Sequence, residues 1–114
     1  MAEFLLLFRH DDIRNANLSP EQMQAQMQKW VAWMGDIASR GKMLSSQPLE
    51  RTGKVVRGTK KAITDGPFAE GKEVIGGYLL CKADTIEEAI AIAEGCPILE
   101  HDAGTVEVRP IGRM

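Results

Sequence analysis

The feature that most constrains the fold is a strand–helix–strand order that occurs twice along the chain. In the first unit, Phe4–Phe8 is a continuous apolar run, short enough to be a strand buried on both faces. A helix is predicted at Glu21–Arg40 and a second strand at Met43–Leu49. Ser19 and Gln22 predict the helix start, because a serine N-cap and a glutamine three positions later can form a reciprocal capping box.

The predicted first helix has one apolar face, which indicates how it packs. Its apolar residues recur at helical spacing and are Met23, Met27, Trp30, Met34 and Ile37. We therefore expect Trp30 and Met34 to be buried against a sheet. Trp33 lies off this stripe and is expected to contribute less. Gly41 is the expected end of the helix, since glycine is common just past a helix C-terminus.

The second unit begins with a strand at Val74–Cys81, continues with a helix and ends with a strand at Thr105–Val108. Asp84 is the expected cap of the helix, with Glu87 at the reciprocal position. Between the two units, Gly53–Thr64 predicts a β-hairpin. The fold class is thus α+β, a ferredoxin-like split βαβ sheet with a hairpin insertion, in which residues 1–114 form a single domain.

Composition favours an ordinary soluble protein and excludes several classes. The 114 residues are 44% apolar and 26% charged, with a net charge of −2, so there is no electrostatic signature of nucleic-acid binding. Glu3 stands where a signal peptide would be basic, and the first apolar run is too short to span a membrane. Cys81 and Cys96 lack metal-ligand spacing, which favours buried thiols in a reducing, cytoplasmic environment.

Right-handed crossovers predict where the polar segments meet. The first two long strands run parallel, with the strand at Val74–Cys81 inserted between them and the last strand beside the first. The end of the first strand then shares one sheet edge with the starts of the last two. The polar segments at this edge are Arg9–Asp12, Asp65–Glu73 and His101–Asp102. We expect these segments, distant in sequence, to be neighbours in space.

Acid/base chemistry is one interpretation of this edge, because histidine titrates near neutral pH and a carboxylate can orient its ring. The candidate catalytic residues are His10, Asp11 and His101. The candidate ligand-binding residues are Arg9, Asp65, Phe68, Glu70, Lys72 and Asp102. Among them, Lys72 could offset the charge of an anionic substrate or intermediate.

Each candidate also has a purely structural interpretation. His10 could be a solvated loop residue, and His101 a surface residue stabilised by a helix dipole. Asp65 could cap its own turn, Phe68 could anchor a loop in the core, and the charges at Glu70–Glu73 could form a solvated face. The two histidines with two aspartates could alternatively bind a divalent metal, but adjacency of His and Asp in sequence is a weak signal. We predict neither a metal nor a cofactor.

The stretch Asp65–Tyr78 reads Asp-Gly-Pro-Phe-Ala-Glu-Gly-Lys-Glu-Val-Ile-Gly-Gly-Tyr and resembles the signature of the DGPF family, a branch of the YCII-related proteins. The resemblance extends to the helix start at Ser19–Glu21 and to the ending at Cys96–Pro110. It implies a dimeric α+β barrel in which two ferredoxin-like sheets face each other. It also implies a bacterial cytoplasmic protein, with some relatives linked to alternative sigma factors.

The resemblance also implies an activity class. Certain YCII-related proteins resemble dehydrochlorinases or lactone isomerases that use a His-Asp couple, with the histidine on the first helix. Here Glu21–Arg40 contains no histidine, and Trp30 and Trp33 stand in its middle. His101 could substitute for the missing side chain.

These observations support three hypotheses. The first is a small homodimer with a polar pocket for a small organic molecule, with lyase or isomerase chemistry. The second is a non-catalytic module that binds a partner protein or a regulatory ligand, and the third is a purely structural dimer. A homodimer is expected because Leu5 and Leu7 would form an apolar second face of the sheet, and large exposed apolar patches are unusual on soluble monomers.

Overall fold

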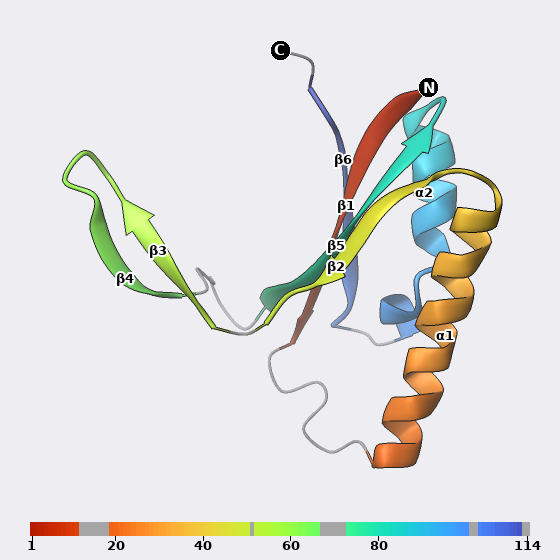
Figure 1. The fold of residues 1–114 in the computed structure, drawn as a ribbon, viewed down its shortest axis with the longest axis horizontal. Coiled ribbons are helices and arrows are strands. Elements are labelled where there is room, and N and C mark those ends of the chain that lie inside the picture. The colour runs from red at the N-terminus through yellow and green to blue at the C-terminus, as the bar shows by residue number, and fades with distance from the viewer. Residues whose placement is uncertain (12–18, 51, 67–72, 101–102, 113–114) are drawn as a thin grey trace.

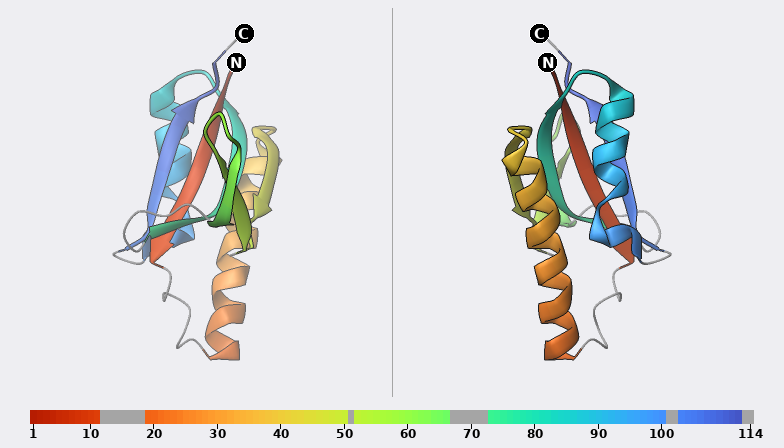
Figure 2. Two further views of the ribbon diagram at one scale, coloured as in Figure 1. Left: turned by 90° about the vertical axis from the view of Figure 1, so that its left-hand side faces the viewer. Right: turned by 90° about the vertical axis from the view of Figure 1, so that its right-hand side faces the viewer.

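The computed structural model describes residues 1–11, 19–50, 52–66, 73–100 and 103–112. Their elements, in chain order, are β1 (Ala2–Asp11), α1 (Pro20–Ser39), β2 (Met43–Pro48), β3 (Gly53–Arg57), β4 (Ala62–Gly66), β5 (Glu73–Ala83), α2 (Ile86–Glu94), the 3-10 helix η1 (Pro97–Glu100) and β6 (Thr105–Pro110). The helices cover one side of a four-stranded sheet, and the β3–β4 hairpin stands on the other side (Figures 1 and 2).

The sheet has the predicted strand order. It runs β2-β5-β1-β6, with β5 antiparallel to both of its neighbours and β6 antiparallel to β1. The two strands that flank each βα connection are therefore separated by one inserted strand, as a split βαβ unit requires. The chain is thus α+β, an antiparallel sheet with two helices that fits the ferredoxin-like plan.

The core lies between this sheet and the two helices. Phe4, Leu6 and Phe8 point to the helical side of β1, and Leu79 and Cys81 point to the same side of β5. The helices complete the cluster with Ile37, Ala89, Ile92 and Ala93, and the segment around η1 adds Cys96 and Ile98. Burying these apolar side chains is the main force that holds the helices to the sheet.

The start of α1 forms as the sequence predicted. The Ser19 hydroxyl accepts a hydrogen bond from the Gln22 backbone N–H at 3.1 Å, and the Gln22 side chain accepts one from the Ser19 N–H at 2.9 Å. The helix ends at Ser39, and Gly41 follows with a φ of +72°, a left-handed conformation that favours glycine.

The predicted apolar face of α1 is only partly correct. Met23 and Met27 are 52% and 67% exposed, because the N-terminal half of α1 extends beyond the end of the sheet (Figure 1). Trp30 and Met34 are half-buried rather than fully buried. Trp33, which the stripe excluded, packs against the same core cluster. The sheet thus covers a face that includes Trp33 and leaves the first turns uncovered.

The second helix begins one residue later than predicted. Thr85, not Asp84, is its N-cap, and the Thr85 hydroxyl accepts a hydrogen bond from the Glu88 N–H at 3.2 Å. Glu88 then takes the role expected of Glu87: its carboxylate accepts a hydrogen bond from the Asp84 N–H and pairs with Lys42. The hydrogen bond from Lys42 is the main reason that the pKa of Glu88 lies below its ordinary value.

Both cysteines are buried and neither forms a disulfide, as the sequence predicted. Burial is the main cause that raises the pKa of the Cys81 thiol, which keeps it protonated.

The longest helix of the described residues, α1, carries several charges, and no helix among these residues combines the length and the apolar character that a membrane span requires.

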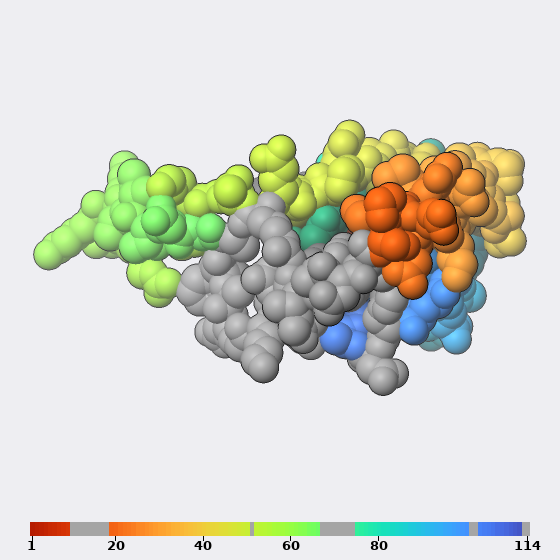
Figure 3. Space-filling model, turned by 90° about the horizontal axis from the view of Figure 1, so that it is seen from below, coloured from red at the N-terminus to blue at the C-terminus, as the bar shows by residue number. Residues whose placement is uncertain are grey.

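The predicted hairpin is present and is slightly longer than expected. β3 and β4 pair from Gly53 with Gly66 to Arg57 with Ala62, in a two-stranded sheet of their own. Gly58 and Lys61 have positive φ angles of 73° and 54°, which form the turn. Seen from below, the hairpin extends well away from α1 (Figure 3).

Candidate functional site

Three strand ends meet at one edge of the four-stranded sheet, as topology predicted. The last residues of β1 pair with the first residues of β5, with Asp11 opposite Glu73 and His10 opposite Val74. On the other side of β1, Arg9 lies opposite Thr105 at the start of β6. The backbones of segments far apart in sequence are therefore adjacent here.

A β-bulge marks this edge. Phe8 pairs with Gly77 and Arg9 pairs with Ile75, so Gly76 is the extra residue on β5. A side chain at Gly77 would lie 3.0 Å from the Gln47 carbonyl oxygen, which explains why the sequence has glycine at this close approach. A bulge changes the direction of the side chains that follow it and is common beside functional sites.

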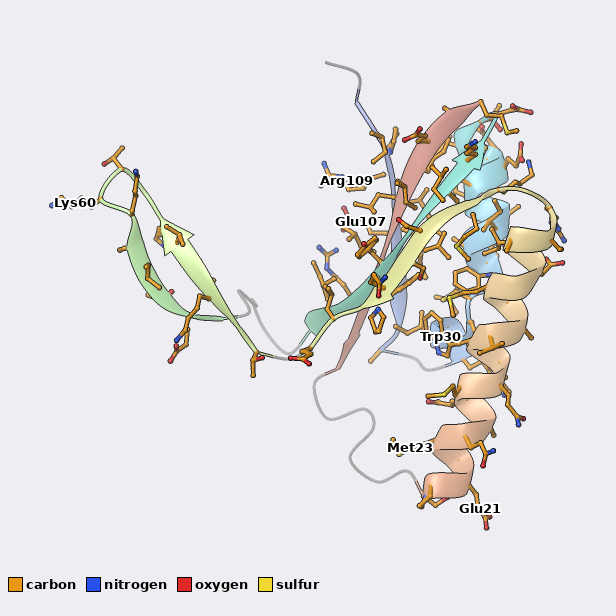
Figure 4. The ribbon with its side chains drawn as sticks, in the orientation of Figure 1. Glu21, Met23, Trp30, Lys60, Glu107 and Arg109 are labelled. Atoms are coloured by element: carbon orange, nitrogen blue, oxygen red, sulfur yellow. The ribbon has the colours of Figure 1, made fainter. Side chains whose placement is uncertain are left out.

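Arg9 is held at this edge by a partner that the sequence did not reveal. Its guanidinium donates a hydrogen bond to the carboxylate of Glu107 on β6, and both side chains are about one-third exposed. Arg109 Nε lies 3.7 Å from the other oxygen of that carboxylate and is more exposed. Glu107 and Arg109 project toward the side of the sheet on which the hairpin stands (Figure 4). The alternation of Val106, Glu107 and Val108 was the signal that could have placed Glu107 on this face.

The helical side of the same region carries an aromatic cluster. Phe8 lies edge-on to Trp30 and Trp33, with ring centroids 5.1 and 5.9 Å away, and the two indoles are 5.7 Å apart. Trp33 Nε1 also donates a hydrogen bond of 3.0 Å to the Ile92 carbonyl oxygen, which fixes the ring against α2. Trp30 lies on the side of α1 that faces the sheet (Figure 4). The middle of α1 is thus apolar and aromatic.

The other predicted site residues are distributed as follows. Asp65 lies on β4, where its side chain is 88% exposed and pairs with Lys54 across the hairpin, so it belongs to the separate two-stranded sheet. The backbones of His10 and Asp11 end β1, while their side chains lie outside the described part of the chain. Five residues lie wholly outside it: Phe68, Glu70, Lys72, His101 and Asp102. A cavity shared by these side chains stays a prediction.

Within residues 1–11, 19–50, 52–66, 73–100 and 103–112, the His, Cys, Asp and Glu side chains form no group of three that could hold a metal ion. The described part of the edge instead offers the Arg9 guanidinium, which the Glu107 carboxylate holds, while the more exposed guanidinium of Arg109 lies further along β6. Such a set can recognise a small polar or anionic group by hydrogen bonds and charge.

Comparison with known proteins gave a family and likenesses to solved structures. The model of the YCII-related domain matches residues 4–114. Comparison with curated proteins gave no match. Among solved structures, the chain resembles 5-chloro-2-hydroxyhydroquinone dehydrochlorinase of Burkholderia phenoliruptrix AC1100, in complex with 2,5-dihydroxybenzoquinone. The identity is 15% and the TM-score 0.48, over 97% of this chain and 95% of that chain.

Proposed function

The chain belongs to the YCII-related family, and we propose that it binds a small polar or anionic organic molecule at the edge where β1 ends and β5 and β6 begin. The observation that carries this proposal is the pairing of Arg9 with both Ile75 and Thr105, which brings three strand ends together. The β-bulge and the Arg9–Glu107 pair at the same place give the edge an irregular backbone and fixed charges.

In the catalytic form of this proposal, His10 or His101 transfers a proton to or from the bound molecule, and Asp11 or Asp102 orients the ring. This couple suits lyase or isomerase chemistry, since both need a group that exchanges protons near neutral pH. Lys72 would offset negative charge that develops on the substrate.

A second candidate function is non-catalytic ligand binding or a regulatory protein interaction. The observation that favours it concerns α1. In the lyases and isomerases that certain YCII-related proteins resemble, the first helix carries the histidine of the His-Asp couple. Here α1 has none, and Trp30 and Trp33 fill its middle by packing on Phe8. Ligand recognition could survive this replacement, whereas proton transfer from the helix could not.

An NMR titration distinguishes these functions. The probes are an unsaturated lactone carboxylate and a chlorinated dihydroxybenzene, added to the 15N-labelled protein. We expect amide shifts at Arg9, Ile75 and Thr105, and a dissociation constant about tenfold weaker in His10→Ala, as for loss of a hydrogen bond to a charged group. Gln28→Ala, on the exposed side of α1, is the control and should bind normally.

The same samples report turnover, as chloride release or lactone isomerisation. Turnover that His10→Ala or His101→Ala removes supports the catalytic form, and binding without turnover supports the non-catalytic one. Absence of shifts at this edge with millimolar amounts of both probes would contradict the proposed site.

We further propose that the protein is a homodimer formed through the sheet face opposite the helices. On this face Leu5 lies opposite Leu80 and Leu7 opposite Tyr78, so four apolar side chains form its centre. All four are half-buried in the single chain. A two-fold dimer would cover them with the same patch of the second copy.

Leu7→Asp is expected to convert the dimer to a monomer, because two carboxylates would be buried at the centre of a two-fold interface. Multi-angle light scattering at micromolar concentration measures the mass. Val31→Asp, on the exposed side of α1, is the matched control and should stay dimeric. A wild-type protein that is monomeric under these conditions would overturn the dimer.

A further inference from the structure

The β3–β4 hairpin is built as an arm rather than as part of the main body. Within the described residues, its strands make extensive contacts only with each other. The Cα radius of gyration is 15.6 Å, whereas a compact chain of this length has about 13 Å. The hairpin stands on the side of the sheet opposite the helices, which is the side of the proposed dimer face (Figures 1 and 2).

One face of the arm carries apolar side chains that the described residues leave largely exposed. Val56 and Ile63 lie directly opposite each other and are 63% and 67% exposed. A two-stranded ribbon in water is marginally stable unless it packs against something else. The arm therefore needs an apolar surface outside its own two strands.

The charge of the arm indicates what that surface is. Gly53–Gly66 contains four Lys or Arg residues and one Asp, a net charge of +3, while the whole chain has −2, which leaves −5 for the remainder. The segment Asp84–Glu100 has five carboxylates and no Lys or Arg. A second copy of this chain thus offers the arm a surface of opposite charge.

The exposed side of α2 is the best match within that acidic segment. Glu88 and Glu100 pair with lysines of their own chain. Glu87 and Glu94 are exposed on the helix, and Ile86 and Ile90 beside them are 38% and 44% exposed. An apolar pair flanked by carboxylates complements Val56 and Ile63 flanked by the turn lysines.

The length of the arm is compatible with a contact beyond the partner's sheet. Five extended residues span about 17 Å, while two stacked sheets lie about 10 Å apart. In a dimer with facing sheets, the tip of the arm would extend about 7 Å past the partner's sheet, toward its layer of helices. Lys60, at the turn, points away from its own chain (Figure 4).

We propose that the hairpin is a dimerisation arm that docks on α2 of a second copy. Val56 and Ile63 pack on the partner's Ile86 and Ile90, and Lys60 and Lys61 meet the partner's Glu87 and Glu94. Two-fold symmetry makes this contact twice. The inference rests on the proposed dimer and adds a second contact to the sheet face.

A charge swap tests the arm. In low salt, Lys60→Glu with Lys61→Glu should raise the dimer dissociation constant at least tenfold, as measured by sedimentation equilibrium. The reason is that two new carboxylates on each arm would then face Glu87 and Glu94 of the other copy, at both of the symmetric contacts. Glu87→Lys with Glu94→Lys should do the same. Combining all four changes should bring the constant back to within about threefold of wild type.

Two further variants keep the result interpretable. Lys29→Glu on α1 with Arg40→Glu at its C-cap makes the same change in net charge and should leave the dimer constant unchanged. Replacing residues 54–65 with a short Gly-Ser linker should weaken the dimer while the monomer still folds, as circular dichroism would show. If the wild type is a dimer and the arm variants dimerise as tightly, the arm proposal is wrong and the sheet-face dimer stands. A monomeric wild type overturns both.

Discussion

Gly104→Ala is expected to destabilise the protein by about 3 kcal/mol, the upper end of the usual cost of overpacking. A Cβ atom at this position would lie 1.9 Å from the Ile98 carbonyl oxygen and 2.8 Å from its carbon. The obstacle is backbone, so no side-chain rotation can relieve it, and the turn between η1 and β6 must shift. This turn leads into β6, which contributes Glu107 to the candidate site. Urea denaturation measures the loss.

The control for this substitution is Gly35→Ala, because a Cβ at Gly35 meets nothing within 4 Å. Gly35 lies inside α1, where alanine is favoured over glycine by about 0.5–1 kcal/mol, so this variant should be slightly stabilised. A Gly104→Ala protein as stable as wild type would mean that the turn does not approach Ile98 in solution.

Trp33→Ala is expected to cost about 3–5 kcal/mol, at least as much as Trp30→Ala, although sequence spacing ranks Trp30 first. Both rings pack on Phe8, and Trp33 in addition donates a hydrogen bond to the Ile92 carbonyl and lies against Gly95. Its removal leaves a cavity between α1 and α2 and takes away the donor of a partly buried carbonyl.

Chemical denaturation of both variants, with Val31→Ala as the control, decides the order. Val31 is exposed on α1, so its truncation should change stability by less than about 0.5 kcal/mol. If Trp33→Ala were as mild as Val31→Ala while Trp30→Ala was severe, the helix would face the sheet as its stripe predicted, and the observed packing would be wrong.

The candidate site was predictable only at the level of the backbone. The crossover rule placed the end of β1 beside the starts of β5 and β6, and the register of Arg9 with Ile75 and Thr105 confirms it. The partner of Arg9 was not predictable, because Glu107 is distant in sequence and only the register of two strands brings the charges together. The position of Asp65 was likewise not predictable, because Asp65 lies on β4, which pairs with β3 in a separate two-stranded sheet.

The sequence by itself determined the order of the main strands and helices and some of their ends, although α2 begins one residue later than predicted. Ser19 and Gln22 form the capping box that their spacing requires, and Gly41 and Gly58 adopt the positive φ angles that favour glycine. These features depend on interactions between near neighbours, so local chemistry is sufficient to specify them.

Only the tertiary structure decided which surfaces are covered. A helical stripe that includes Met23 and Met27 was indistinguishable in sequence from a buried one. However, α1 extends beyond the end of the sheet, and among the described residues both methionines are more than half exposed. Trp33 is fixed by a hydrogen bond to Ile92 of α2, which is distant in sequence. The hairpin is exposed because its two strands form a sheet of their own. A side chain is buried only where another element packs against it. The apolar periodicity of one helix does not show how far the sheet beneath it extends.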